Sequence, residues 1–302
     1  MAKFGGPGSQ MRPDLGQAVL PNLQSASDAA IGFQLAPLAT VPGVSGHYRV
    51  LDWAAMAEKN HEQKRGSGTK PNETFFTQSE QTWGCVRYAL RDFIDEDDMR
   101  SEGGDRGMVE TSLIGLLTNQ IVRAHEERVV VIANTITDTS SPVVKWGAAT
   151  ATTIRANLHT AIQAIVDGTY GTVIPNTIAM DYKVLHALLR APEFVSMLGG
   201  AASMDQVYRK MVYGLLTEMG LTKVLVSHTG ALGENVYIVH APDSVQTLKT
   251  TFTSLASPVV ASNIEVWTEE DGAKITWYNV QLEVDEILVH DAAGYRFTSV
   301  LS

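Results

Sequence analysis

Twenty residues near the middle of the chain, 173–192 (VIPNTIAMDYKVLHALLRAP), constrain its fold most tightly. An apolar run ending at Met180 predicts a short buried strand, with Pro175 and Asn176 marking a joint. Asp181 is placed to cap the helix that follows. That helix is predicted from apolar residues at helical spacing before Pro192, namely Val184, Leu185, Leu188 and Leu189. We find no catalytic pattern in this segment and interpret it as a packing element.

A long amphipathic helix is predicted over residues 107–134, about seven turns or 40 Å at 1.5 Å per residue. Its apolar stripe comprises Val109, Leu113, Leu116, Leu117, Ile121, Ala124 and Val131. A helix of this length exceeds what a compact domain needs, so we interpret it as a structural spine. A second helix is predicted over residues 153–167, capped by Thr152 or Thr153, and a third ends at Gly220.

Beyond Gly220 the pattern changes from helices to strands. Apolar and β-branched runs predict strands over residues 223–227, 236–240, 259–267 and 274–290, with residues 269–272 forming a turn before the longest one. Helices followed by strands indicate an α+β fold rather than an alternating α/β fold.

The first 46 residues differ in composition from the rest of the chain. They hold seven of the 25 glycines and five of the 11 prolines but only four charged residues. This composition has too little regularity for a buried element and too little charge for a solvated tail. We therefore predict an N-terminal arm over residues 1–46 that becomes ordered against a partner, with a floppy leader as the alternative.

Residues 47–85 are predicted to form an extended loop built as a long β-hairpin. Two strand-like flanks, residues 47–53 and 74–87, enclose a polar centre that contains glycine. The tip of this hairpin is basic, since it carries Lys59, Lys64, Arg65 and Lys70. Five aromatic residues also lie along the hairpin, namely Tyr48, Trp53, Phe75, Phe76 and Trp83. We predict that these nine side chains are inter-subunit contacts, although a solvated loop has the same composition.

The balance of charge limits the partners of this chain. Its net charge is −10 and its pI is about 5.3, which argues against a surface that grips nucleic acid. Residues 221–302 carry ten acidic and four basic side chains, a net of −6, whereas the hairpin tip is basic. Opposite charges on two parts of one subunit favour contact between subunits.

The sequence shows no convincing catalytic constellation. Cys85 is the only cysteine and lacks an activating motif, so it is predicted to be a small core residue, and no apolar run is long enough to span a bilayer. His125 and Glu126 are predicted to lie at a solvated helix end, because no second histidine completes a zinc motif. His228, His240 and His290 lie near strand ends, where convergence on a metal remains an open alternative. We expect no enzymatic activity, cofactor or bound metal.

The order of these elements resembles that of the tailed-bacteriophage major capsid protein family. The resemblance covers residues 45–300, and its sharpest local part is Pro175-Asn176-Thr177 leading to Met180, then Leu188-Leu189 and Pro192. This chain has Asp181 where many members carry glycine. The resemblance implies a peripheral domain with the spine helix (residues 86–144 and 261–302), an axial domain (residues 145–260), and the extended loop and N-terminal arm.

The resemblance also implies a function. A member of this family self-assembles as pentamers and hexamers into an icosahedral virion head, assembled in the host cytoplasm, that encloses double-stranded DNA without sequence-specific binding. Portal, scaffolding and decoration proteins are possible partners, and no membrane is involved. Two alternatives stay open, namely an encapsulin-like nanocompartment shell with the same fold and, more remotely, a metal-dependent hydrolase.

Overall fold

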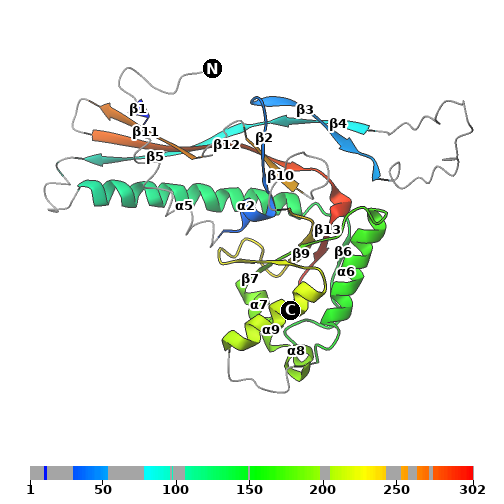
Figure 1. Ribbon diagram of the computed structural model, residues 1–302. Coiled ribbons are helices and arrows are strands. Elements are labelled where there is room, and N and C mark those ends of the chain that lie inside the picture. The colour runs from blue at the N-terminus through cyan, green and yellow to red at the C-terminus, as the bar shows by residue number, and fades with distance from the viewer. Residues whose placement is uncertain are drawn as a thin grey trace, which may run out of the picture.

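The computed structural model describes residues 10–11, 30–53, 78–95, 97, 106–148, 150–197, 205–242, 253–257, 264–271 and 275–301. Two main sheets lie in two parts of the molecule (Figure 1). An elongated upper layer contains the longest helix and the longest strands. A more compact body with the shorter helices lies below one end of this layer.

The upper layer is a six-stranded sheet centred on β12 (Ile275–Leu288). β12 pairs antiparallel with β11 (Ile264–Asp271), β5 (Val86–Asp95) and β10 (Thr253–Ser257). Two short N-terminal strands complete the sheet, since β1 (Gln10–Met11) pairs with β11 and β2 (Leu38–Thr40) runs parallel to β10. The predicted strand over residues 274–290 is therefore confirmed. The predicted turn over residues 269–272 is wrong for its first three residues, because residues 269–271 belong to β11 and pair with β12.

Helix α5 (Arg106–Ala133) lies along this sheet (Figure 1). Its length confirms the predicted long helix. Its buried face differs from the predicted stripe, because Leu116 and Val131 are 53% and 66% exposed. The buried side includes Ile114, Thr118, Ile121, His125 and Val129. Some residues on this buried side are polar, and each lies at helical spacing from an apolar one. Apolar periodicity alone therefore does not identify the buried face of α5.

The lower body contains a five-stranded sheet in the order β6-β13-β9-β7-β8. These strands are β6 (Thr139–Ser140), β7 (Thr177–Asp181), β8 (Lys223–Ser227), β9 (Val236–Val239) and β13 (Gly294–Phe297). The helices are α6 (Ile154–Gly168), α7 (Tyr182–Arg190), α8 (Pro192–Met197) and α9 (Asp205–Glu218). One face of the sheet shares a core with α5, and the other shares a second core with these helices.

Local signals explain how the strand β7 connects to α7. β7 is fully buried, and Asp181 caps α7 by accepting a hydrogen bond from the backbone N–H of Lys183 at 3.1 Å. This confirms the predicted cap. The predicted Thr153 cap of α6 is wrong, because the backbone N–H of Ile154 instead donates to Glu193 Oε2 at 2.6 Å. A carboxylate at a helix N-terminus is also favoured by the helix dipole.

Part of the predicted N-terminal arm is integral to the core, which corrects the expectation that it holds no buried element. Helix α2 (Gly32–Leu35) packs against α5, and Ala30, Ile31 and Leu35 are buried with it. A Cβ atom on Gly32 would lie only 3.0 Å from the Cα atom of Glu126. The absence of a side chain at Gly32 therefore allows the two helices to approach closely.

The predicted hairpin is present at its base. β3 (Ser45–Leu51) pairs antiparallel with β4 (Gln78–Gly84) over seven residue pairs. This two-stranded ribbon extends from the upper layer on the side opposite the start of α5 (Figure 1). The basic tip with Lys59, Lys64, Arg65 and Lys70, together with Phe75 and Phe76, lies outside the described residues.

The buried face of α5 can be tested by two matched truncations. Ile121→Ala should lower the free energy of unfolding by roughly 2–5 kcal/mol, because Ile121 is 3% exposed in the core. Leu116→Ala, in the same helix, should change it by about 0.5 kcal/mol or less because Leu116 faces outward. Urea unfolding followed by circular dichroism measures both, and equal effects would contradict this assignment.

Candidate assembly surfaces

The predicted anchor Tyr48 lies on β3 and packs within its own chain. Its hydroxyl donates a hydrogen bond to Gln81 Oε1 on β4 at 2.5 Å, and its ring contacts a small core with Val50 and Ile287. Burial and the nearby charge of Asp285 raise the pKa of Tyr48 to about 12. The phenol therefore stays protonated, and it ties the hairpin to the end of β12.

Trp53 anchors the chain where it enters the extended loop. Its indole Nε1–H donates to Nε2 of His290 at 2.9 Å, and the two rings lie 4.4 Å apart. Trp53 is buried, so most of the indole surface contacts its own subunit. The acceptor role requires His290 to be unprotonated at Nε2.

Trp83 on β4 completes the base of the hairpin. Its Nε1–H donates to the carbonyl of Gly43 at 3.2 Å, and its ring covers Gly46 so closely that a Cβ there would lie 2.3 Å away. The three described aromatic anchors thus fix the direction of the hairpin. Their role as inter-subunit contacts, like that of the six tip residues, remains a prediction.

A second surface is the outer face of the upper sheet. The register of β5 and β12 places Arg87, Arg91 and Phe93 on the face opposite Tyr278 and Leu282. Phe93 lies 5.0 Å from the Trp277 ring, and the guanidinium of Arg91 lies 4.7 Å above that ring. Arg87 pairs with Glu283 at 2.9 Å. This exposed row combines aromatic area with paired charges, as inter-subunit surfaces commonly do.

Buried charges join α5 to its neighbours, which corrects the prediction that His125 and Glu126 lie at a solvated helix end. His125 Nδ1 lies 2.8 Å from Glu286 Oε1 of β12, and Arg128 Nε donates to the same oxygen at 2.9 Å. Glu126 accepts hydrogen bonds from the backbone N–H of Ile31 and from the hydroxyl of Thr229. About one turn of this helix thereby connects α2, β12 of the upper sheet and the segment that follows β8 of the lower sheet.

The protonation of this cluster follows from its surroundings. Burial lowers the pKa of His125 below its ordinary 6.5, and the Glu286 carboxylate only partly offsets this. Burial alone would raise the pKa of Glu286, but the hydrogen bonds and charges of His125 and Arg128 together lower it. A neutral His125 therefore donates its Nδ1–H to an ionised Glu286. Its Nε2 is buried without a hydrogen-bond partner in the described part of the chain.

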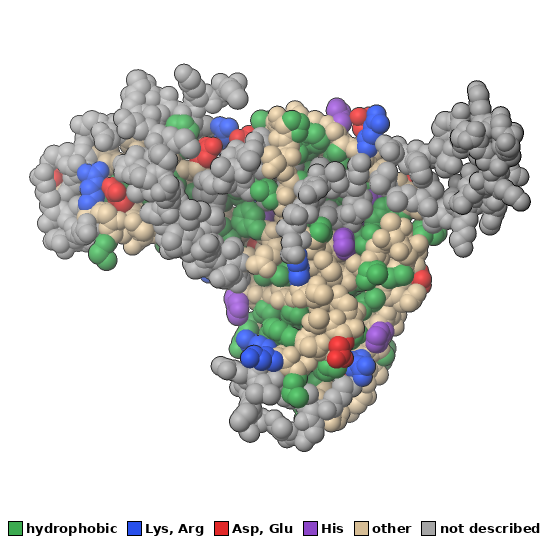
Figure 2. Space-filling model, viewed as in Figure 1, with side chains coloured by type: hydrophobic (Ala, Val, Ile, Leu, Met, Phe, Trp, Pro, Cys, Tyr) green, Lys and Arg blue, Asp and Glu red, His purple; other side chains and the backbone are tan. Residues whose placement is uncertain are grey.

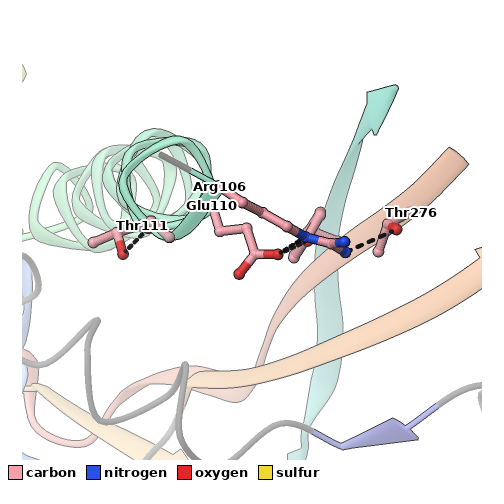
Figure 3. A network of polar contacts seen from close by, with 6 residues as sticks. Arg106, Glu110, Thr111 and Thr276 are labelled. Carbon is pink, nitrogen blue, oxygen red and sulfur yellow. Dashed lines mark hydrogen bonds and ion pairs between the residues drawn. The ribbon is translucent and has the colours of Figure 1, made fainter. Parts of the chain in front are cut away.

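A second network fixes the start of α5 (Figure 3). Arg106 donates from Nε to Glu110 Oε1 at 2.8 Å and reaches Thr276 on β12. The same carboxylate oxygen accepts the hydroxyl of Tyr278 at 2.5 Å. Burial and this contact raise the pKa of Tyr278 to about 12. Both ends of the long helix are thus attached to β12 by charged side chains.

The described residues offer little for catalysis. His228 stacks on Tyr182, His240 donates to the carbonyl of Ile174, and His290 accepts from Trp53, so the three histidines have different neighbours. No cluster of three metal-ligating side chains occurs in the described ranges. Burial, with the charges of Asp285 and Glu283, raises the pKa of Cys85 to about 11, which disfavours a reactive thiolate.

Two further properties of the described surface bear on partners. Among the described helices, none is long and apolar enough to cross a membrane. Figure 2 shows few charged side chains over the lower body on the visible face, where apolar and neutral side chains predominate. This agrees with the low charged fraction of the sequence, 19%.

Comparison with known proteins identifies the fold. No protein-family model matches the chain, and no curated protein matches it by sequence. A solved phage-related protein from Bordetella bronchiseptica RB50 superimposes with a TM-score of 0.67 at 19% identity, covering 96% of this chain and 97% of that chain. The capsid of Myoviridae phage XM1 gives 0.57 at 10% identity, covering 98% and 94%.

A virus-like particle from Pyrococcus furiosus gives a TM-score of 0.58 at 10% identity, with 94% and 98% of the two chains covered. These matches extend over nearly the whole of both chains. The chain therefore has the α+β fold of tailed-phage major capsid proteins, as the order of its predicted elements indicated.

The buried histidine makes a testable contribution to the pH dependence of stability. Because the pKa of His125 is lower folded than unfolded, the unfolded chain binds more protons below about pH 6.5, and stability falls on acidification. His125→Asn keeps an N–H for Glu286 but cannot titrate. It should lose less stability than the wild type between about pH 7 and about pH 5, as measured by urea unfolding.

The exposed His159 provides the control for this measurement. His159→Asn makes the same substitution at a side chain that lies in solvent on α6, so it measures the effect of replacing a histidine outside the core. The lowered pKa of His240 contributes in the same direction in all three proteins, so the difference between variants isolates His125. An unchanged slope in His125→Asn would show that burial does not perturb this imidazole.

Proposed function

We propose that this chain is a major capsid protein that assembles as pentamers and hexamers into an icosahedral phage head enclosing double-stranded DNA. One observation carries the proposal: the fold match to the capsid of Myoviridae phage XM1 covers 98% of this chain and 94% of that chain, so nearly the whole polypeptide shares the fold of that capsid. Fold alone does not establish function. The proposal therefore also draws on the surfaces of the molecule.

The architecture suits a subunit that is held mainly by its neighbours. The long α5 and β12 form a stiff layer, and the β3–β4 hairpin extends the subunit beyond this layer (Figure 1). Many modest contacts repeated by symmetry would close a shell without any single strong contact. Such a mechanism needs no cofactor and no catalytic turnover.

The proposed domains follow the predicted ranges with three changes. Apart from these changes, we assign the peripheral domain to residues 86–144 and 261–302 and the axial domain to residues 145–260. Sheet membership favours moving β6 and β13 to the axial domain, because both belong to the sheet of β7. It favours moving β10 to the peripheral domain, because β10 pairs with β12.

Charge supports a container that does not bind DNA by sequence. A net charge of −10 would not trap a polyanion during packaging. We propose that the chain resides in the virion capsid, is assembled in the host cytoplasm, and meets portal, scaffolding and decoration proteins there. The alternative of an encapsulin-like shell is not favoured, because similar structures include a phage-related protein, a Mycobacterium phage and the capsids of two further phages. We propose a structural role without enzymatic activity.

Assembly of the purified chain tests this function directly. Electron microscopy with mass determination should show closed shells, or rings of five or six subunits. If assembly needs a scaffolding protein, shells should form when the chain is co-expressed with phage structural genes, so the test is repeated in that way. A monodisperse monomer under all these conditions would contradict the proposal.

The extended loop allows a more local test. Deleting residues 58–70 should leave a folded subunit that assembles poorly, because the loop is proposed to act between chains. The matched control keeps the full length of the loop and replaces Lys59, Lys64, Arg65 and Lys70 by Gln. It separates the effect of the positive charge at the tip from the effect of the length of the loop. Analytical ultracentrifugation measures the assembled fraction, and normal, stable shells from the deletion would refute the role of the loop.

A further inference from the structure

Strand β8 forms an open edge of the five-stranded sheet. It is the last strand in the sheet order, and in the described ranges it pairs with β7 alone. The backbone N–H of Lys223 donates to the carbonyl of Asn176, on the β7 side, at 2.9 Å. Because backbone groups alternate along a strand, the N–H and C=O groups of Val224 and Val226 point to the open side.

The open side is a groove. Two cavities of about 300 and 580 Å³ lie along it, and both are lined by Val224, Leu225 and Gln34. The opposite wall comes from the segment of α2 and the start of β2, through Ile31, Phe33 and Leu38. A groove that runs beside an unpaired strand has the shape required for a further extended segment.

The two edges of this sheet are protected to different degrees. β6, at the other edge, contains two residues and is followed closely by Pro142, and short strands and prolines protect an edge from pairing. β8 contains five residues without proline, and its one charged residue, Lys223, directs its ammonium to the carbonyl of Ala241. Within the described ranges, the edge of β8 therefore lacks the short length, proline and outward charge that usually prevent strand addition.

One end of the groove collects hydrogen-bond donors and positive charge. Arg209 and Tyr213 of α9 lie there with Tyr182 and His228, whose rings are 5.2 Å apart. Among the described residues, no acidic side chain lines either cavity. This end would favour a carboxylate, whereas the chain as a whole has 33 acidic and 23 basic residues.

We propose that the open edge of β8 receives an extended acidic segment of a second copy of this chain. The incoming backbone pairs with the outward groups of Val224 and Val226, and one of its carboxylates contacts Arg209. The groove and the acidic segment are different surfaces, so the contact is heterologous and can propagate around a ring. This inference rests on the proposed function, since it names one contact by which the subunits assemble.

Charge reversal with a matched neighbour tests the donor end of the groove. Arg209→Glu should raise the protein concentration needed for assembly about tenfold or more, because an attraction becomes a repulsion. Lys210→Glu makes the same charge reversal at the next residue of α9. Lys210 is exposed and does not line either cavity, so this variant should assemble as the wild type does. Light scattering across a concentration series measures both variants.

Proline at the edge tests strand addition itself. Val224→Pro removes an outward N–H that β7 does not use, so the subunit should fold and fail to assemble. Val224→Thr keeps that N–H and should assemble normally. Circular dichroism checks the fold, and if Val224→Pro does not fold, the charge-reversal pair still decides.

The outcomes distinguish this inference from the proposed function. Assembly of Arg209→Glu at the wild-type concentration, or an equal loss in Lys210→Glu, would overturn the β8 contact while shells of the wild type still support the proposed function. A wild type that never assembles would overturn both. Loss of assembly in Arg209→Glu with normal assembly in Lys210→Glu would support the contact.

Discussion

The contact between α5 and β12 is the interaction on which the rest of this structure depends. Arg106 and Glu110 join them at the start of the helix, and His125 and Arg128 join them at Glu286 near its end. A buried carboxylate is stable only when hydrogen-bond donors surround it. Glu110 and Glu286 therefore fix the position of α5 along β12. Glu126, one residue from His125, carries that register to α2 and the lower sheet.

Features governed by local sequence could be predicted, and those governed by distant partners could not. The helix over Arg106–Ala133, the Asp181 cap and the strand over Lys223–Ser227 follow from spacing and capping within a few residues. The buried side of α5 was missed because Thr118, His125 and Glu126 resemble solvent-facing residues until their partners are known. Glu193 caps α6 from 39 residues away, a distance that no local pattern encodes.

The candidate surfaces show the same division. Aromatic residues along the hairpin are predicted anchors for a neighbour, and within the subunit Tyr48 and Trp53 are buried near Leu288 and His290. Composition indicates that such side chains are covered, and it does not say by which chain. The groove beside β8 gave no sequence signal, because it arises from the order of strands and from the placement of α2 across from them.

The parallel pairing of β2 with β10 has a consequence for how a newly made chain folds. Leu38 lies beside Leu255, and the core under α2 also contains residues from β12, so a segment early in the sequence is completed by strands that come much later in it. Contacts so distant in sequence close slowly, and β2 stays without its partner strand until β10 has been made. A subunit of this kind reaches a state that can bind its partners only late in its folding, so that its synthesis and its association are separated in time.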